Sequence, residues 1–312
     1  MFVKARYFNS LKIHSNGTQV TKTSDDTHKL IDEIVWYLDL PDELKCYIPK
    51  VHSFSLDRKV PSITLDFVPG GTLGDALVAE GWTKREWDAA FRCLRQTLED
   101  FASFSGNMSK AYLYEMYIGK TRERMDRFLH QCEWARQVHA RGYFWLNGKT
   151  RMSPTVMLQK GTEEVLHLLE EPQITVVHGD FCLSNLFYSP QSNNMTAIDP
   201  RGSFGIRTIY GDHRYDWAKL RHSLTGYEHI VRGKFDINVG ADSIDLRLEL
   251  NEDAVRLRSR LDSWLQPKQI KTVRIIEALL FLSMLPLHKD TPDRQLAFFA
   301  LGTELLEQAL SE

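Results

Sequence analysis

Short runs of residues that favour β-strands, separated by turn residues, occupy much of the first seventy positions. We expect strands over residues 2–8 and 18–23, joined by a hairpin turn at Ser15-Asn16-Gly17. A second pair of strands is expected over residues 47–56 and 61–68. The beginning of the chain is therefore predicted to be β-rich.

One predicted helix separates these two strand pairs. It extends from about Asp26 to Pro41, where the proline ends the pattern. Its apolar residues recur at helical spacing: Leu30, Ile31, Ile34, Val35 and Leu38.

The chain changes character after Pro69-Gly70-Gly71, the strongest break in its first third. Only residues 174–177 and 195–198 then read as short buried strands. We therefore expect an α+β fold, with a small β-rich N-terminal lobe (residues 1–68) and a larger, mainly helical C-terminal lobe (residues 69–312). Its predicted helices are residues 84–104, 114–138, 155–169, 252–265, 267–287 and 294–310.

Composition narrows the functional class. With 312 residues, 43% hydrophobic and 26% charged, the chain has ordinary globular composition and room for one large or two modest domains. A net charge of −2 gives no general attraction to nucleic acid, so no such partner is expected. The four cysteines form no CxxC pair, which favours free thiols in a reducing compartment.

No targeting or membrane segment is evident. The N-terminus lacks the apolar stretch of a signal peptide. The longest apolar run, residues 278–287, is shorter than the about 20 residues that cross a bilayer. We expect a cytoplasmic protein without a membrane span.

A strand-and-loop segment at 176–205 carries the candidate chemistry. His178-Gly179-Asp180 follows a predicted buried strand, Asn185 comes five residues after Asp180, and Asp199 follows the next strand. Phosphoryl transfer needs a carboxylate for the acceptor hydroxyl and oxygen ligands for magnesium on the phosphates. An aspartate, an asparagine and a second aspartate supply those groups.

The pattern H-G-D-x-x-x-x-N followed by I-D resembles the catalytic signature of the aminoglycoside phosphotransferase and choline kinase superfamily. The resemblance implies a two-lobed protein-kinase-like fold, with ATP and Mg²⁺ as cofactors and a small-molecule hydroxyl as acceptor. By it, Asp180 is the catalytic base, and Asn185 and Asp199 hold magnesium. The segments D-P-R-G and G-D-H-R-Y-D-W-A-K-L resemble a subgroup associated with bacterial capsule and surface-polysaccharide gene clusters, and Asp216 resembles the aspartate that hydrogen-bonds the catalytic loop.

The residues of this segment also allow two other kinds of chemistry. His178 and Asp180 could belong to a metal hydrolase, but no second His/Asp cluster at ligand spacing supports it. Cys182 could be a nucleophile, but no histidine is placed beside it by a motif, and a small buried hydrophobic residue is the simpler interpretation.

A kinase also needs a lysine for the α- and β-phosphates and a glutamate that positions it. Lys22 lies on a predicted strand, and Glu33 lies on the next helix among apolar residues. Both could instead be surface residues. Lys4 and Lys12 are the fallback choices if the strand register is shifted.

The stretch from Ile63 to the Pro-Gly-Gly break resembles the family's hinge, where the backbone contacts adenine. Asp66, Phe67 and Val68 would supply backbone donors and acceptors there. The opening strands lack a glycine-rich phosphate loop, which leaves open how the phosphates are covered.

Several cationic residues follow Asp199: Arg201, Arg207, Arg214, Arg221, His213 and His222. Arginine suits bidentate recognition of carboxylate or phosphate. We therefore expect Arg201 and Arg214 to select an anionic acceptor; alternatively, the arginines pair with Asp212 and Asp216 to brace the loop.

The expected function is transfer of the γ-phosphoryl of ATP to a hydroxyl of a small metabolite, such as an anionic sugar or sugar phosphate of surface-polysaccharide metabolism. The alternatives are a catalytically silent kinase-like binding protein, an AMP-transferring pseudokinase relative, and a choline/ethanolamine-type or aminoglycoside kinase. A protein kinase is disfavoured, because no A-P-E segment is recognisable.

Overall fold

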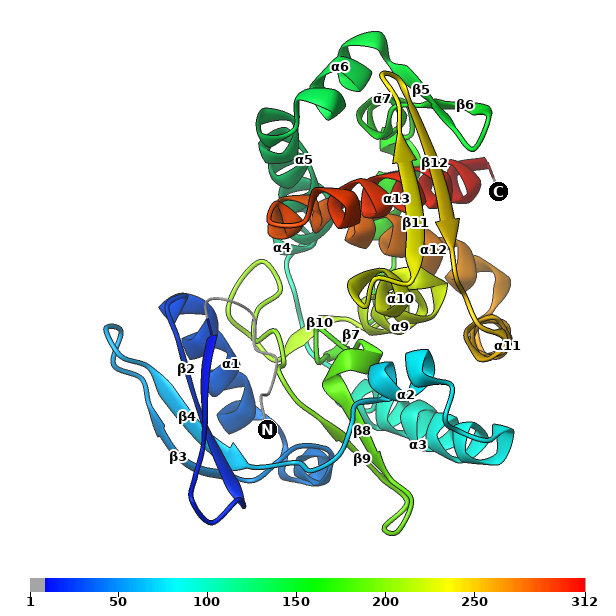
Figure 1. The fold of residues 1–312 in the computed structure, drawn as a ribbon. Helices are drawn as coiled ribbons and strands as arrows, with labels where there is room; N and C mark the ends of the chain where they lie inside the picture. Colours follow the sequence, from blue (N-terminus) through cyan, green and yellow to red (C-terminus); the bar gives the residue numbers. More distant parts are fainter. Residues whose placement is uncertain (1–8, 312) are drawn as a thin grey trace. The chain divides into compact units, whose positions relative to one another are not determined.

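Contacts between residues divide the chain into two compact units. The computed structural model describes residues 9–311. The first unit comprises the chain up to Ala76, Gly81–Met108 and Ile174–Asp216; the second comprises Leu77–Glu80, Ser109–Gln173 and the chain from Trp217 onward. Figure 1 labels the helices and strands. The lobe boundary expected at residue 68 stays a prediction.

An antiparallel four-stranded sheet opens the first unit. Its strand order is β1-β2-β4-β3. The turn expected at Ser15-Asn16-Gly17 joins β1 to β2, and Gly17 has φ +69° there. The strand expected over residues 2–8, with Lys4, lies outside the described residues. The strand bounds are β1 Asn9–Ile13, β2 Gln19–Ser24, β3 Val51–Ser55 and β4 Ser62–Asp66.

Helix α1 (Thr27–Asp39) packs on this sheet as its apolar spacing predicted (Figure 1). The side chain of Asp26 accepts the Lys29 amide hydrogen and caps the helix. Leu30 and Ile34 of α1 share a buried core with Ile63 and Leu65 of β4. The core therefore fixes which face of α1 meets the sheet.

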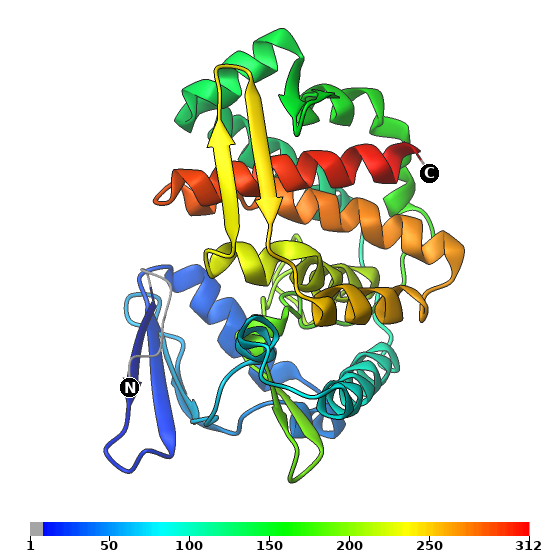
Figure 2. The ribbon, with the colours of Figure 1, turned by 45° about the vertical axis from the view of Figure 1, so that its right-hand side comes forward.

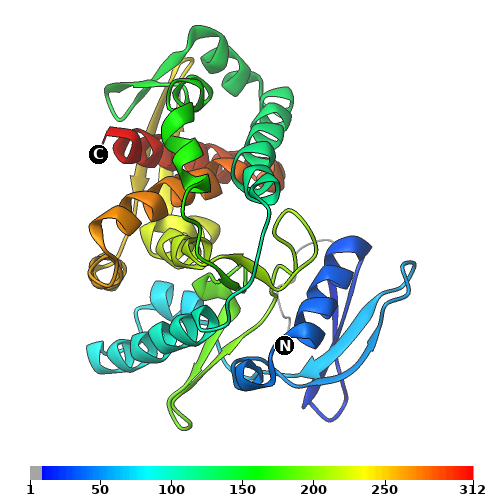
Figure 3. The same ribbon diagram turned by 180° about the vertical axis from the view of Figure 1, so that it is seen from behind.

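The rest of the first unit carries the strand-and-loop segment. Helix α3 packs beside β9 (Figure 3), and β7 pairs with β10, a strand that the sequence pattern did not predict. The strands expected near residues 174–177 and 195–198 are confirmed as β7 and β9. The bounds are α3 Lys84–Ala102, β7 Ile174–Val176, β8 Leu186–Ser189, β9 Asn194–Ala197 and β10 Tyr210–Asp212, with 3-10 turns at Asp42–Tyr47 and Leu183–Asn185.

The second unit is mainly helical around one apolar core, in which α12 and α13 pack along each other (Figure 1). Its helices are α4 Lys110–Tyr114, α5 Lys120–Gln131, α6 Glu133–Arg141, α7 Pro154–Lys160, α8 Thr162–Leu166, α10 Glu228–Val231, α11 Glu252–Asp262, α12 Pro267–Ser283 and α13 Pro292–Ser311. Helices α2 (Leu73–Ala79) and α9 (Arg214–His222) run across the division between units. Two π-helical turns (Glu115–Gly119, Ser223–Tyr227) and two 3-10 turns (His167–Leu169, Leu285–His288) complete the set. None of the described helices is long and apolar enough to span a membrane.

Two expected helices are shorter than predicted. The helix expected over residues 114–138 is interrupted at Cys132, whose backbone is extended. The helix expected over 155–169 is divided at Gly161. Amphipathic spacing continues across both breaks, so periodicity alone did not reveal them.

The second unit also contains a four-stranded sheet that was not predicted, of order β11-β12-β5-β6. Asn147 and Gly148 both have positive φ in the β5–β6 hairpin, so this Asn-Gly pair was the missed signal. Figure 2 shows the β11–β12 hairpin lying across α13. The bounds are β5 Tyr143–Leu146, β6 Lys149–Met152, β11 Phe235–Val239 and β12 Ser243–Leu248.

Candidate active site

Three charged side chains of the first unit meet at Lys22. Its Nζ lies 2.7 Å from Oε2 of Glu33 and 2.8 Å from Oδ1 of Asp199. Lys22 comes from β2 and Glu33 from the sheet-facing side of α1, and both side chains are buried. Asp199 is half-exposed. The structure thus brings the predicted lysine, glutamate and second aspartate together, whereas the fallback Lys12 is exposed on β1.

The ammonium group of Lys22 pairs with two carboxylates, those of Glu33 and Asp199. Burial alone would lower the pKa of Lys22, but the charges of Glu33 and Asp199 outweigh burial and raise it above its ordinary value. Burial raises the pKa of Glu33 to about 7, opposed by Lys22 and reinforced by Asp199. Lys22 therefore stays charged, and Glu33 is the member that gains a proton near neutral pH.

The loop at Asp180 is held by hydrogen bonds from its backbone amides to the Asp216 side chain. The carboxylate of Asp216 accepts the amide hydrogens of His178 and Gly179 at 2.7 and 2.8 Å, the role that the resemblance implied. Gly179 has φ +76°, and a Cβ there would lie 2.7 Å from Cβ of Arg201. Glycine is required because the backbone turns sharply against a neighbouring loop.

Asn185 links the two predicted aspartates. Its Nδ2 donates to the carbonyl oxygen of Asp180 at 2.9 Å and to Oδ2 of Asp180 at 3.3 Å. The main-chain carbonyl oxygen of Asn185 accepts a hydrogen bond from the amide of Ile198, the residue before Asp199. Asp199 itself has φ +58°, a left-handed conformation that is uncommon outside glycine and clusters at functional sites.

The oxygen atoms at this point fit a magnesium ion. Asn185 donates through Nδ2, and its Oδ1 accepts no hydrogen bond from the described residues. Asp199 binds Lys22 through Oδ1, so its Oδ2 is also available to a metal. One amide and one carboxylate oxygen, completed by phosphate and water, are the donor set that Mg²⁺ prefers. Residues 9–311 contain no group of three His, Cys, Asp or Glu side chains placed to hold a metal.

His178 is a buried neutral side chain. Its ring lies edge-on to those of Trp36 and Phe181, and its Nδ1 faces the amide of Asp180 at 3.3 Å. Burial lowers the pKa of His178 to about 4, against the pull of Asp180 and Asp199. It therefore supports the loop by packing. Cys182 is also buried, as expected for a small hydrophobic residue.

Of the three expected hinge residues, two already use their backbone N–H groups. Asp66 donates to the carbonyl of Lys50 at 3.0 Å, and Phe67 donates to that of Thr18 at 2.8 Å. Within the described part of the chain, the amide of Val68 donates to no backbone carbonyl.

The two arginines expected at an acceptor site differ in their surroundings. Arg214 is buried, and its Nε and Nη2 donate to the carboxylate of Asp212 at 2.5–2.9 Å. This geometry favours the bracing alternative for Arg214. Arg201 is half-buried, and its Nε donates to the Ser203 carbonyl at 3.1 Å, while its terminal nitrogens donate to no described residue.

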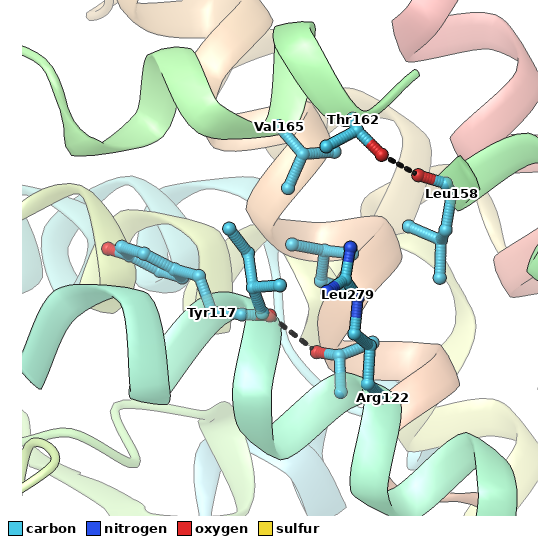
Figure 4. A pocket seen from close by; sticks show the side chains of 8 residues that line it. Tyr117, Arg122, Leu158, Thr162, Val165 and Leu279 are labelled. Carbon is cyan, nitrogen blue, oxygen red and sulfur yellow. Dashed lines mark hydrogen bonds between the residues drawn. The ribbon is translucent and has the colours of Figure 1, made fainter. Parts of the chain in front are cut away.

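A pocket lies wholly in the second unit (Figure 4). Its threonine hydroxyls donate to main-chain oxygens, as Thr162 does to Leu158. None of the predicted site residues lines it; the lining residues are Tyr117, Ile118, Thr121, Arg122, Leu158, Thr162, Val165 and Leu279.

No protein-family model matches the chain, and no curated protein matches its sequence. Solved structures do match it. The structure of aminoglycoside phosphotransferase APH(4)-Ia matches this chain at 13% identity and a TM-score of 0.56. The match covers 100% of this chain and 92% of the APH(4)-Ia chain. The chain has the fold of an aminoglycoside phosphotransferase. A thermostable APH(4)-Ia mutant in a ternary complex with AMP-PNP and hygromycin B gives 14% identity, 100% and 92% coverage, and a TM-score of 0.57. APH(3'')-Id from Streptomyces rimosus gives 16% identity, 87% and 89% coverage, and a TM-score of 0.52.

The aminoglycoside phosphotransferase fold confirms the expected fold class, a small β-rich region followed by a larger helical part. Sequence reasoning missed the contacts that secure α1 in this fold. Trp36 donates from Nε1 to the carbonyl of Val177, and Asp32 pairs with Arg207.

Proposed function

We propose that the chain is a small-molecule kinase that transfers the γ-phosphoryl of ATP to a hydroxyl of its acceptor. The observation that carries the proposal is the meeting of Lys22, Glu33 and Asp199, with Asp180 and Asn185 on the adjoining loop. Such a set supplies phosphate binding, metal ligands and a base, which is what phosphoryl transfer requires. The fold shared with nucleotide-binding phosphotransferases supports it.

In this proposal each residue has a separate task. Lys22 neutralises the phosphates, and Glu33 orients Lys22. Asn185 and Asp199 hold Mg²⁺, which offsets the charge of the phosphates. Asp180 accepts the proton of the acceptor hydroxyl as that oxygen attacks the γ-phosphorus; the bond from this phosphorus to the β,γ-bridging oxygen breaks, and ADP leaves. The hydrogen bond from Asn185 keeps the Asp180 carboxylate oriented.

The two lobes, residues 1–68 and 69–312, would divide the work between nucleotide and acceptor. Val68 is the proposed adenine contact. Among the three hinge residues, its amide is the one that donates to no backbone carbonyl in the described part of the chain, so it can donate to adenine. Asp66 and Phe67 would contribute carbonyl oxygens and an apolar wall. A kinase that draws on ATP in this way is proposed to work in the cytoplasm.

The acceptor is proposed to be an anionic sugar or sugar phosphate, as used in surface-polysaccharide metabolism. Arg201 supports this, because its terminal nitrogens have no partner among the described residues and it packs against the glycine beside Asp180. An Arg201→Ala variant should raise the acceptor KM and leave the KM for ATP unchanged. Arg95→Ala, on the exposed face of α3, is the matched control. An unchanged acceptor KM would remove Arg201 from the acceptor site.

The deciding experiment is Mg²⁺-dependent ATP consumption, screened against sugars, sugar phosphates, amino alcohols and aminoglycosides. Asp180→Asn should lower kcat by about 100- to 10,000-fold while nucleotide binding persists. Asp39→Asn, an exposed aspartate at the end of α1, should leave turnover unchanged. If the wild-type protein neither binds nucleotide with magnesium nor consumes ATP with any acceptor class, the enzyme proposal fails. Binding without turnover would instead indicate a silent binding protein.

A further inference from the structure

The loop that follows Asp199 runs directly against helix α1. At Gly202 the backbone has φ +68°, and a Cβ would fall far inside contact distance of the Asp32 carbonyl and 2.8 Å from the amide nitrogen of Glu33. Only glycine combines this conformation with so close an approach. The main chain of the loop therefore touches the turn of α1 that carries Glu33.

An ion pair joins the same two segments. Nε of Arg207 lies 2.6 Å from Oδ1 of Asp32, the residue before Glu33. The Arg207 side chain is 44% exposed and the Asp32 side chain 19%, so the pair lies at the surface and is open to screening by salt. The amide of Thr208 donates to the carbonyl of Gly202 at 3.1 Å, which closes the loop between the two contacts. Gly202 and Arg207 are therefore tied to each other as well as to α1.

A third contact secures the next turn of α1. The indole nitrogen of Trp36 donates to the carbonyl of Val177 at 2.8 Å in the buried interior, just before the His-Gly-Asp loop. Asp32 and Trp36 lie on either side of Glu33 in the sequence. Glu33 thus sits between two points at which α1 is fastened to the loops that carry Asp180 and Asp199.

We propose that Asp32 and Arg207 are positioning residues that hold α1 where Glu33 can orient Lys22. Neither residue touches the phosphates in this proposal; they act through Glu33. When the Asp32–Arg207 pair is lost, the turn of α1 that carries Glu33 becomes more mobile. Lys22 then loses the fixed position of Glu33 and pairs mainly with Asp199. If Lys22 is already held in place before the nucleotide binds, no conformational entropy is lost in ordering it on binding. The kinetic consequences rest on the proposed kinase function, whereas the effect on α1 does not.

Hydrogen–deuterium exchange of the protein without nucleotide tests the structural part. Arg207→Gln should speed exchange of the α1 amides by about 3- to 10-fold, since local opening follows the loss of local contacts. Lys29→Gln is the matched control, because Lys29 pairs with Asp26 at the start of the same helix. The exchanged pair, Asp32→Arg with Arg207→Asp, should restore most of the protection. Equal exchange in Arg207→Gln and wild type, or no recovery in the exchanged pair, overturns the proposal.

Kinetics of the same variants test the functional part. Arg207→Gln should lower kcat/KM for ATP by about 3- to 10-fold, with the acceptor KM unchanged and the effect fading in high salt as screening weakens the wild-type pair. A loss confined to the acceptor KM would contradict positioning of Lys22. A wild-type protein without nucleotide binding or turnover would overturn the kinase proposal, and the exchange measurement would still decide the role of the pair.

Discussion

Nζ of Lys22 lies 2.8 Å from Oδ1 of Asp199, although 177 residues separate them in the chain. Through this contact, the sheet residue proposed for phosphate binding and the loop residue proposed for the metal meet at a single point. Glu33 completes the cluster, so one buried cation faces two carboxylates. The arrangement makes Lys22 central to both the electrostatics and the stability of the first unit.

Replacing Lys22 by methionine should destabilise the protein, more at pH 8 than at pH 5.5. Without the cation, Glu33 is a buried charge with no partner, a change that typically costs about 3–5 kcal/mol. With Lys22 in place, burial already raises the pKa of Glu33 to about 7, and loss of the cation removes an influence that lowers it. The neutral form of Glu33 is therefore favoured further in the folded variant, and the penalty grows as pH rises above the ordinary pKa, where the unfolded chain releases the proton. Urea unfolding at the two pH values measures the difference.

Two further variants make this test specific. The double variant Lys22→Met/Glu33→Gln should be more stable at pH 8 than Lys22→Met alone, since it removes the stranded carboxylate. Lys12→Met changes an exposed lysine on the neighbouring strand β1 and should have little effect. Equal stability of the Lys22→Met and Lys12→Met variants would contradict the buried cluster.

Asp199→Asn should abolish metal-dependent nucleotide binding without large loss of stability. Asparagine tolerates the left-handed backbone at φ +58°, so the loop is retained while a charged metal ligand is lost. The loss should exceed the roughly 10- to 100-fold typical of residues that only support a ligand. Removal of Mg²⁺ with EDTA should have the same effect on the wild-type protein. Titration of a fluorescent ATP analogue, with and without Mg²⁺, provides the measurement, and unchanged metal dependence would exclude Asp199 as a ligand.

Acid should destabilise the first unit between about pH 6.5 and pH 4, because of His178. Burial lowers the pKa of His178 to about 4 from its ordinary 6.5. Below pH 6.5 the unfolded chain binds a proton that the folded protein does not, so stability falls as pH falls through this window. A pKa lowered from 6.5 to about 4 corresponds to at most about 3–4 kcal/mol of stability. His178→Asn should flatten this part of the stability curve, while His167→Asn, an exposed histidine, should leave it unchanged. If the stability of His178→Asn falls with pH as steeply as that of the wild-type protein, other groups cause the acid destabilisation.

Local patterns predicted the parts of the site that depend on one element at a time. The strand predicted over residues 18–23 placed Lys22 on β2, and helical spacing placed Glu33 on the buried face of α1. The spacing of Asp180 and Asn185 followed from the motif. These features are encoded within a dozen residues, so the sequence shows them directly.

Contacts between distant segments were not readable in this way. Strand β12 pairs in parallel with β5 through Ser243 and Trp145, and no local pattern specifies that pairing. Trp36 likewise donates to the carbonyl of Val177, which lies 141 residues further along the chain. The Asp32–Arg207 pair was missed for the same reason. Partner choice is a property of tertiary packing, which one sequence does not reveal.

Gly202→Ala should be markedly more destabilising than Gly17→Ala. The two glycines have nearly the same backbone, with φ +68° and +69°, so each alanine bears a similar conformational cost of about 1–2 kcal/mol. At Gly17 the added methyl group meets nothing within 4 Å, whereas at Gly202 it collides with the backbone of Asp32 and Glu33. Overpacking of this kind adds about 1–3 kcal/mol. Chemical denaturation of both variants isolates the collision as the difference between them. If the two differ by less than about 0.5 kcal/mol, the scatter expected of independent sites, then the loop does not press on α1 as the structure shows.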